Sequence, residues 1–414
     1  MQHKEHYDVI VIGGGASGMM AAGTAALRGK KVLILEKNAK IGEKLGITGG
    51  GRCNLTNAEY DIHALLSNYG KAKPFLYTPF AQFGVEDTFK FFESRGMKIV
   101  VEARKRAFPE SQNAKDVVNV MRKYIKSPNV TTRVNYPVTK ILSADGKITG
   151  VKVHRESFTA DNYILSVGGA SHPETGSTGD GFKWLEDIGH KVNKPSPDIV
   201  PLKSSDKWVH NLSGTSLSFM KITFFVDGVK AFSKEGKILF THFGLSGPLI
   251  LNSAKQVSEL LKSGDVTAKI DCYPDTDLGA LDKKILKTFD DNKNKEYRNI
   301  LKAITPAGMS DVLLNFRIVP TLDTKVHSIS KEQRRKIAEL LKNLPVKIDG
   351  LMGMDRAVVS DGGVVLEEVD MKTMRSKVFS NLFFTGDILH INRPSGGFSL
   401  QLCWTTGYIA GQNV

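Results

Sequence analysis

Short apolar runs separated by glycine-rich turns open the chain. Residues 7–13 read YDVIVIG and residues 31–37 read KVLILEK, and both runs are rich in β-branched or aliphatic side chains. Such runs are typical of strands buried on both faces of a parallel sheet. Between them, the alanine-rich segment 16–27 has high helix propensity and ends before Gly29. The pattern predicts a βαβ unit of about 30 residues.

The C-terminal part of the chain shows the same alternation. Residues 381–387 read NLFFTGD, which predicts a short buried strand. Residues 393–411 begin with a Gly-Gly turn and continue as a helix whose small residues, such as Gly407, allow close packing. Further β patterns at 148–153, 163–169 and 356–369 extend this part of the fold.

The middle of the chain follows a different pattern. A proline-rich polar stretch at 194–201 indicates a boundary, and short β runs continue up to residue 277. We expect one helix there to begin near Ser246. Residues 278–345 have a mainly helical pattern, with Ser330 and Gln333 spaced as a capping box.

Glycines after the first strand have the G-x-G-x-x-G spacing of a dinucleotide-binding turn. The first glycine permits the tight turn, the second lets the backbone approach a pyrophosphate, and the third allows close helix–strand packing. The free N–H groups of the following helix favour phosphate. A carboxylate at the end of the second strand favours a ribose without a 2′-phosphate. The predicted contacts are Gly13, Gly15, Ala16, Ser17, Gly18, Glu36 and Lys37.

Residues 42–57, GEKLGITGGGRCNLTN, contain three consecutive glycines and few bulky apolar residues. We expect no regular helix or strand there, but a loop that lies against the cofactor through exposed backbone. A mobile surface loop is the alternative. The predicted contacts are Gly50, Gly51, Arg52, Cys53 and Asn54.

The first fingerprint does not separate NAD from FAD. Residues 381–398 resemble the second FAD signature of flavoproteins with two dinucleotide-binding domains. The resemblance implies that Asp387, after Gly386, holds a ribitol hydroxyl of FAD. It also implies that the helix N-terminus at Gly397 and Phe398 points at the N1–C2=O side of the isoalloxazine, where a helix N-terminus stabilises negative charge.

Seven segments together resemble the BaiN/RdsA/aminoacetone-oxidase family of NAD(P)/FAD-dependent oxidoreductases, over essentially the whole chain. They are GGGASG (13–18), GITGGGRCNLTN (46–57), RAFPESQNAKDVV (106–118), GGASHPETGSTGDG (168–181), THFGLSGP (241–248), TMRSK (373–377) and GDILHINRPSGGFSLQ (386–401). This chain has Gly386-Asp387 where many relatives have Gly-Glu, and Ser166-Val167 before its Gly-Gly pair.

Membership implies an α/β fold, in which a Rossmann-like FAD-binding domain is interrupted by a β-rich domain and a helical insert. We place the FAD-binding domain at 1–194 and 346–414, the β-rich domain at 195–277 and the basic helical insert at 278–345. A length of 414 residues agrees with two or three domains.

The cysteines bear on compartment and on chemistry. Cys53, Cys272 and Cys403 are far apart, so we expect no disulfide framework, no metal site and a reducing, cytoplasmic setting. No apolar run reaches the roughly 20 residues of a membrane span. The absence of a C-x-x-C pair excludes dithiol flavin reductases, so the flavin itself would transfer the hydride.

Candidate catalytic residues lie between the ribitol aspartate and the flavin helix. His390 and Arg393 are the main candidates, and His242 and Cys53 are weaker ones. A structural role is the alternative for each of them. A second G-x-G-x-x-G is missing, so NAD(P)H would reduce the flavin as a transient visitor.

Charge is concentrated in the helical insert. The chain has 57 Lys and Arg against 43 Asp and Glu, a net charge of +14. Residues 280–347 hold 15 basic and 8 acidic residues, so half of that excess lies there. The basic insert predicts a polyanionic partner, although a solvated helix face is the alternative.

The resemblance associates the family with uridine reduction in 23S rRNA, reduction of steroid-like enones, and aminoacetone oxidation. The basic insert favours ribosomal RNA and dihydrouridine formation. The alternatives are an O2-dependent oxidase of a small amine such as aminoacetone, and an RNA-binding or assembly factor that keeps FAD structurally.

Overall fold

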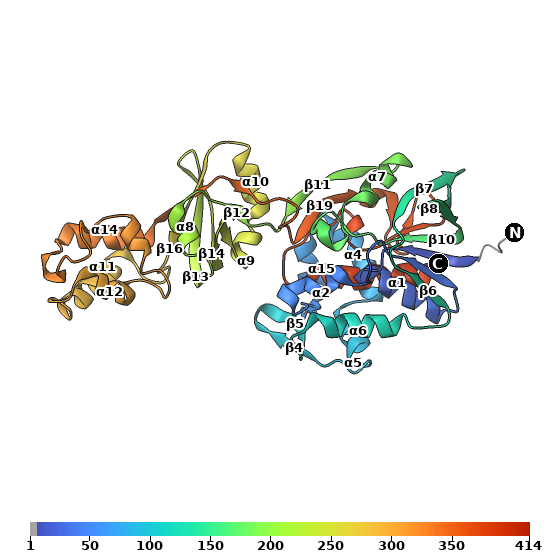
Figure 1. The fold of residues 1–414 in the computed structure, drawn as a ribbon, viewed down its shortest axis with the longest axis horizontal. Helices are drawn as coiled ribbons and strands as arrows, with labels where there is room; N and C mark the ends of the chain where they lie inside the picture. Colours follow the sequence, from blue (N-terminus) through green and yellow to red (C-terminus); the bar gives the residue numbers. More distant parts are fainter. Residues whose placement is uncertain (1–5) are drawn as a thin grey trace. The chain divides into compact units, whose positions relative to one another are not determined.

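The computed structural model describes residues 6–414, which form two compact units (Figure 1). Unit 1 contains the two ends of the chain, up to Pro197 and from Met354 onward. Unit 2 is the inserted segment Asp198–Gly353. Among the described residues, every helix is too short or too polar to cross a bilayer.

Unit 1 is built on a seven-stranded sheet with the order β20-β21-β22-β10-β1-β2-β6. The five strands from β22 to β6 are parallel to their neighbours, and β20 and β21 are antiparallel additions at one edge. In sequence order the strands are β1 (Tyr7–Ile12), β2 (Val32–Leu35), β6 (Val130–Arg133), β10 (Ala160–Leu165), β20 (Val369–Asp370), β21 (Arg375–Ser376) and β22 (Leu382–Phe384). The predicted βαβ unit is confirmed, and β10 lies between strands from opposite ends of the chain.

Small residues let the first and last helices pack closely in unit 1. They are α1 (Ala16–Leu27) and α15 (Phe398–Asn413). A methyl group at Gly407 would lie 2.5 Å from the Ser17 carbonyl oxygen, and one at Gly411 would lie 2.5 Å from that of Ala21. The close contact of these helices holds the two chain ends in one core.

Smaller sheets and helices surround this core. The strands are β3 (Thr56–Asn57), β4 (Ile99–Glu102), β5 (Arg106–Pro109), β7 (Val138–Ala144), β8 (Lys147–Val153), β9 (Glu156–Phe158), β11 (Val192–Asp198) and β19 (Val359–Val364). The helices are α2 (Glu43–Ile47), α3 (Ile62–Leu66), α4 (Lys73–Gln82), α5 (Val85–Glu93), α6 (Ala114–Tyr124) and α7 (Asp180–Asp187). The expectation that 42–57 has no regular structure is wrong for α2, whose Leu45 is buried in the core.

Unit 2 has its own seven-stranded sheet, with the order β17-β16-β13-β14-β15-β12-β18. Its strands are β12 (Leu202–Lys203), β13 (Ser216–Val226), β14 (Val229–Thr241), β15 (Gly244–Ser246), β16 (Val266–Asp271), β17 (Leu344–Ile348) and β18 (Gly350–Leu351). The helices α8 (Lys207–Asn211), α9 (Pro248–Leu251) and α10 (Ala254–Leu261) accompany the sheet. The helix expected near Ser246 is α9, which has Pro248 as its first residue. It begins just after Ser246, because β15 pairs with β14 up to that residue.

The rest of unit 2 is helical and has a separate apolar cluster that includes Leu281, Ile300 and Ile337. Its helices are α11 (Leu278–Asp290), α12 (Tyr297–Ile304), α13 (Val312–Asn315) and α14 (Lys331–Lys342). The Ser330–Gln333 capping box at the start of α14 is confirmed. The chain returns to unit 1 at Met354 and not at residue 346, because β17 still pairs with β16.

Candidate functional site

Three loops from distant parts of the sequence meet at the carboxyl edge of the parallel sheet in unit 1. They follow β1, β10 and β22, which are adjacent in the sheet. Thr385 Oγ1 donates to Ser17 Oγ at 3.0 Å and lies 2.8 Å from Ser166 Oγ. Ligands of open α/β sheets bind at this edge.

The glycine turn after β1 has one open position. A Cβ at Gly13, where φ is +101°, would lie 2.5 Å from Ser166 O, and one at Gly18 would lie 2.0 Å from Gly13 O. A Cβ at Gly15 would meet no atom within 4 Å. Gly15 is also the N-cap of α1, so the open space lies at the end where the first-turn amides of Ala16 and Ser17 are free of helical partners. The turn therefore offers a cradle for an anion.

The carboxylate of Glu36 lies beside this cradle. Glu36 Oε2 accepts from Gly14 N at 2.7 Å, and Oε1 accepts from Asn38 N at 2.8 Å. Burial raises the pKa of Glu36, and the two backbone amides oppose that shift. Each oxygen keeps a second lone pair for a ribose hydroxyl. The neighbouring Lys37 instead donates to Thr178 and Asp180.

The N-terminus of α15 is fixed by the strand that ends the glycine-rich segment. Gly397, with φ of +100°, caps α15, and a Cβ there would lie 2.2 Å from the Thr56 carbonyl carbon. The Asn54 side chain is oriented with its amide nitrogen toward Thr56 O and Ala107 O. Its amide oxygen then accepts a hydrogen bond from Gly397 N at 3.0 Å. Gln401, on the first turns of α15, receives a hydrogen bond of 2.6 Å from Thr56 Oγ1.

The predicted loop residues 50–53 have different surroundings. Added Cβ atoms at Gly50 and Gly51 would meet no atom within 4 Å, so the backbone there is open to a close approach. The Arg52 side chain turns to the neighbouring hairpin, where it pairs with Glu102 and lies 4.0 Å from the Phe108 ring centre. Cys53 is fully buried, and burial raises the pKa of its thiol to about 12. Cys53 is thereby unsuited to acid–base chemistry near neutral pH.

Arg393 and Asp387 form a buried ion pair. The Arg393 guanidinium binds the Asp387 carboxylate, and its other nitrogens donate to Ile391 O and to Ser399 Oγ. Arg393 is only 2% exposed. Its donors are therefore directed at the protein, and it orients Asp387 rather than presenting charge to a substrate.

Lys44 is a residue of the site that sequence reasoning missed. Its Nζ donates to Ser171 O at 2.9 Å and to Ser171 Oγ at 2.8 Å. Burial lowers the pKa of Lys44, and the nearby Asp387 carboxylate partly opposes that shift. Lys44 lies in the quoted segment 42–57, but only the fold brings it to Ser171 and Asp387, which are distant in sequence.

The two histidine candidates lie in different units. In unit 1, His390 Nδ1 lies 2.6 Å from Asn193 Nδ2, and Nε2 lies 3.1 Å from Asp361 Oδ1. The His390 ring therefore lies between the Asn193 amide and the Asp361 carboxylate. His242 belongs to unit 2, is exposed and packs its ring against Phe243.

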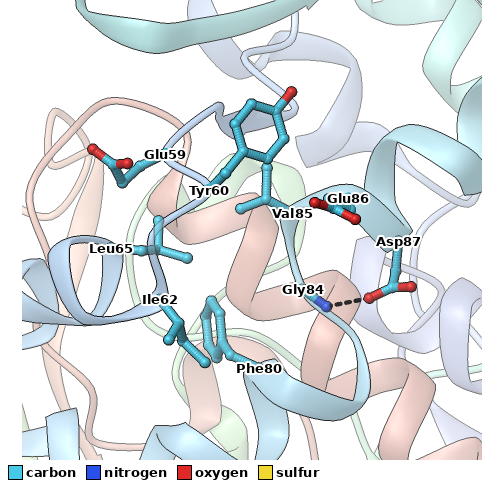
Figure 2. Close-up of a pocket in the computed structure, with 9 residues that line it drawn as sticks. All are labelled: Glu59, Tyr60, Ile62, Leu65, Phe80, Gly84, Val85, Glu86 and Asp87. Atoms are coloured by element: carbon cyan, nitrogen blue, oxygen red, sulfur yellow. Dashed lines mark hydrogen bonds between the residues drawn. The ribbon is translucent and has the colours of Figure 1, made fainter.

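A pocket of about 160 Å³ lies elsewhere in unit 1, and no predicted site residue lines it (Figure 2). Ile62, Leu65 and Phe80 form its apolar side, and three carboxylates, Glu59, Glu86 and Asp87, surround it. Its volume is below the roughly 300 Å³ at which ligand pockets usually begin.

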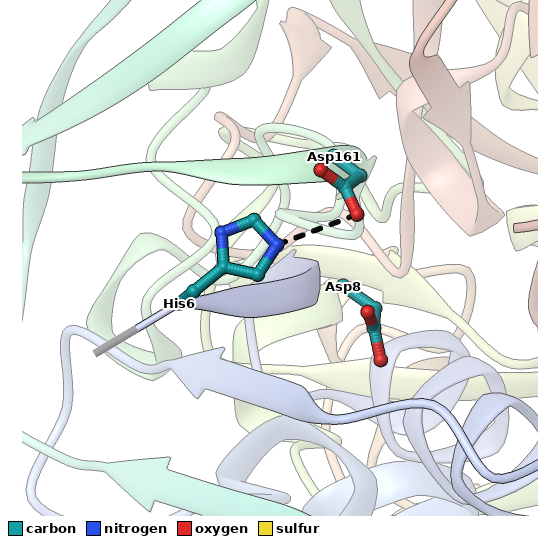
Figure 3. A group of neighbouring side chains, drawn as sticks. All are labelled: His6, Asp8 and Asp161. Atoms are coloured by element: carbon teal, nitrogen blue, oxygen red, sulfur yellow. Dashed lines mark ion pairs between the residues drawn. The ribbon is translucent and has the colours of Figure 1, made fainter.

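One group of described residues has the spacing of metal ligands (Figure 3). His6, Asp8 and Asp161 lie where β1 and β10 begin, which is the edge of the sheet opposite the glycine turn. Asp8 accepts from Lys31 N, and the His6–Asp161 pair is well exposed. This group is outside the dinucleotide site.

Comparison with known proteins identifies relatives over the whole length of the chain. The model of the HI0933-like protein Rossmann domain matches residues 7–413. The 3-dehydro-bile acid delta(4,6)-reductase of Clostridium scindens is 27% identical over 406 residues, which cover 97% of each chain. The ribosomal RNA dihydrouridine synthase of Escherichia coli is 25% identical, covering 99% of this chain and 98% of its own. That of Haemophilus influenzae is 26% identical and covers 99% of each.

Solved structures show the same fold at low identity. The 3-ketosteroid delta1-dehydrogenase of Sterolibacterium denitrificans matches 98% of this chain and 99% of its own, with a TM-score of 0.54 and 14% identity. FrdA of the Escherichia coli quinol fumarate reductase matches 99% of this chain and 69% of its own, with a TM-score of 0.53 and 13% identity. The chain belongs to the HI0933-like Rossmann-domain family and has a Rossmann-like FAD-binding fold.

Proposed function

We propose that unit 1 binds FAD and that the protein reduces a carbon–carbon double bond, with uridine in 23S rRNA as the favoured substrate. The open position at Gly15 carries the cofactor assignment, because it combines open backbone with the free first-turn amides of the α1 N-terminus, which together suit a pyrophosphate. Glu36 lies beside this cradle, and Asp387 lies in the loop after β22. Their carboxylates can accept hydrogen bonds from ribose and ribitol hydroxyls. The residues present therefore fit FAD.

When bound, FAD supplies hydride transfer from its N5 atom. The α1 N-terminus would neutralise phosphate charge, and Glu36 would accept hydrogen bonds from the ribose hydroxyls. Arg393 holds one oxygen of Asp387, which leaves the other for ribitol. The amides at the α15 N-terminus and the buried Lys44 ammonium place positive charge on the side where the isoalloxazine would become anionic. His390, whose Nε2 lies 3.1 Å from Asp361 Oδ1, is the proposed proton donor.

Two full-length relatives support the reaction class. One is named a delta(4,6)-reductase and the other a dihydrouridine synthase, and both names describe addition of hydrogen to a carbon–carbon double bond. NAD(P)H as a transient reductant and a cytoplasmic location complete the proposal.

The charge distribution on the helical part of unit 2 favours RNA as the substrate. Lys283, Lys284 and Lys287 on α11 are exposed, and no ion pair involves them among the described residues. Lys284 Nζ lies over the Tyr273 ring, 5.4 Å from its centre. Unpaired lysines on one helix attract phosphates. Neither a small amine nor a substrate of the size of a bile acid would need such a basic surface for its binding.

The basic cluster on α14 is mostly neutralised. Arg335 pairs with Glu339, Lys336 pairs with Glu332, and Arg334 binds Asp282 of α11 through two hydrogen bonds of 2.8 and 3.0 Å. The sequence groups these residues with Lys331 as one basic run. The structure leaves Lys331 as the member with no acidic partner among the described residues.

Anaerobic flavin kinetics test this function. Purified holoenzyme would be reduced with NADPH or NADH and then mixed with unmodified 23S rRNA fragments, an enone, or O2. We expect rRNA to reoxidise the flavin fastest and to yield dihydrouridine. If only the enone reoxidises the flavin, the protein is a reductase of carbon–carbon double bonds and the proposal of an RNA substrate is wrong. Peroxide release with aminoacetone under air would establish the oxidase instead.

A further inference from the structure

The turn between β4 and β5 holds two consecutive residues in the left-handed backbone region. Arg104 has φ of +61° and Lys105 has φ of +57°. Long side chains rarely adopt this region, because the left-handed backbone is sterically strained for residues with a Cβ. Such strain is often kept where it places a side chain for function. This turn begins the segment 106–118, which neither the cofactor nor the proposed chemistry uses.

The three basic side chains of this turn differ in their partners. Lys105 Nζ lies 2.5 Å from Glu59 Oε2. Arg106 pairs with Glu102 at 3.7 Å. The Arg104 side chain is exposed, and in the described part of the chain no hydrogen bond, ion pair or ring contact engages its guanidinium. Arg104 is therefore the cation of the turn that is available to a ligand.

The turn is attached to the N-terminus of α15. Asn57 Nδ2 donates to Arg104 O at 3.2 Å and to Gly396 O at 3.1 Å, so one side-chain amide joins the two backbones. Gly397, the cap of α15, packs directly on Thr56 and Asn57. Arg104 thus lies beside the helix end that the flavin ring is proposed to face, and all these residues belong to unit 1.

We propose that Arg104 is a specificity residue, which binds a phosphate of the substrate next to the base that is reduced. The inference rests on the proposed function and names the residue that would recognise the phosphodiester of its substrate. A guanidinium recognises phosphate through paired hydrogen bonds, which lysine does not reproduce. Neither a neutral enone nor a primary amine carries a negative charge that such a cation would pair with.

The experiment compares Arg104→Gln, Arg104→Lys and the control Lys105→Gln, all as FAD-loaded protein. Lys105 shares the strained turn, but its ammonium is already paired with Glu59. The ligands are the trinucleotide UpUpU and the nucleoside uridine, which lacks phosphate. Their binding is read from the change in the visible flavin spectrum of the oxidised protein, and turnover is read from reoxidation of the reduced protein.

We expect Arg104→Gln to weaken UpUpU binding and raise its KM about tenfold, with kcat within about twofold, and Arg104→Lys to restore part of the loss. Uridine binding should not change in any variant, and Lys105→Gln should behave as the wild type. Arg104→Gly relieves the left-handed strain, so it should lose UpUpU affinity without a lower melting temperature.

Equal UpUpU binding in wild type and Arg104→Gln, or no spectral response to UpUpU in the wild type, would overturn the assignment. An equal loss for UpUpU and uridine would also overturn it, since Arg104 would then act on the base or on the fold. If UpUpU binds through Arg104 but does not reoxidise the flavin, the proposed reaction is wrong, whereas the phosphate site at Arg104 is supported.

Discussion

Individual residues at the site gain or lose roles once their contacts are known. Arg393 has the sequence position of an active-site residue, yet its guanidinium is buried against Asp387, Ile391 and Ser399. Lys44 has no distinctive sequence signal, yet its ammonium is held at Ser171 beside the same aspartate. Contact with the rest of the fold, and not residue type, separates an orienting residue from one that faces a ligand.

Gly15→Val tests the cofactor cradle directly. The added side chain starts in a space with no atom within 4 Å and at an ordinary negative φ, so the fold should tolerate it. It would occupy the position that we propose for the pyrophosphate of FAD. We expect colourless protein, with FAD content below about a tenth of the wild type, and a melting temperature close to that of FAD-stripped wild type.

Gly18→Val provides the contrast, since its Cβ would lie 2.0 Å from Gly13 O. This variant should lose folding stability as well as colour. Yellow, fully loaded Gly15→Val would show that the cradle does not bind the phosphates.

At the scale of elements, α11 and α14 divide the basic insert into unequal parts. The ion pairs Arg334–Asp282, Arg335–Glu339 and Lys336–Glu332 neutralise α14. The lysines of α11 have no such partners among the described residues. An RNA contact is therefore expected at α11.

The triple variant Lys283→Gln, Lys284→Gln, Lys287→Gln should bind rRNA fragments more weakly. For each lysine that neutralises a phosphate in the wild type, its removal should also reduce the slope of log affinity against log salt by about 0.7–0.9. Fluorescence anisotropy at several salt concentrations measures both quantities.

The control is Arg335→Gln, Lys336→Gln, which removes two positive charges from paired positions, against three in the triple variant. We expect a smaller loss of affinity, because Glu339 and Glu332 already offset these cations. An equal loss of binding free energy per removed charge in the two variants would show that only total charge matters and that α11 is not a specific contact.

At the scale of the whole molecule, the two units have separate apolar cores. The unit 1 cluster joins residues from both chain ends, including Val11 and Trp404, whereas the unit 2 clusters lie between Leu202 and Leu351. The proposed FAD contacts all lie in unit 1. Ligand binding stabilises the part that holds the ligand.

Thermal unfolding should therefore show more than one transition. Removing FAD should lower the midpoint of one transition and leave another in place, as measured by calorimetry and by tryptophan fluorescence. Trp184 and Trp404 lie in unit 1 and Trp208 lies in unit 2, so Trp208→Phe assigns the signals. A single transition that shifts as a whole on FAD removal would contradict independent cores.

The sequence by itself determined the nucleotide unit. The βαβ pattern, the glycine spacing, the place of Glu36 at the end of the second strand and the Gly-Gly turn before α15 can all be read from short segments, because local periodicity and turn chemistry record which elements such segments form. The capping box at Ser330 was predictable for the same reason.

Only the tertiary structure decided which distant groups meet. Asn57 joins Arg104 to Gly396, Lys44 reaches Ser171, and β17 stays with β16 beyond the expected boundary at 346. Charge shows the same limit, because composition counts Arg335 and Lys287 alike, whereas the fold pairs one and leaves the other exposed. Sequence spacing carries no information about such long-range pairs, whose partners are set by how sheets and helices pack.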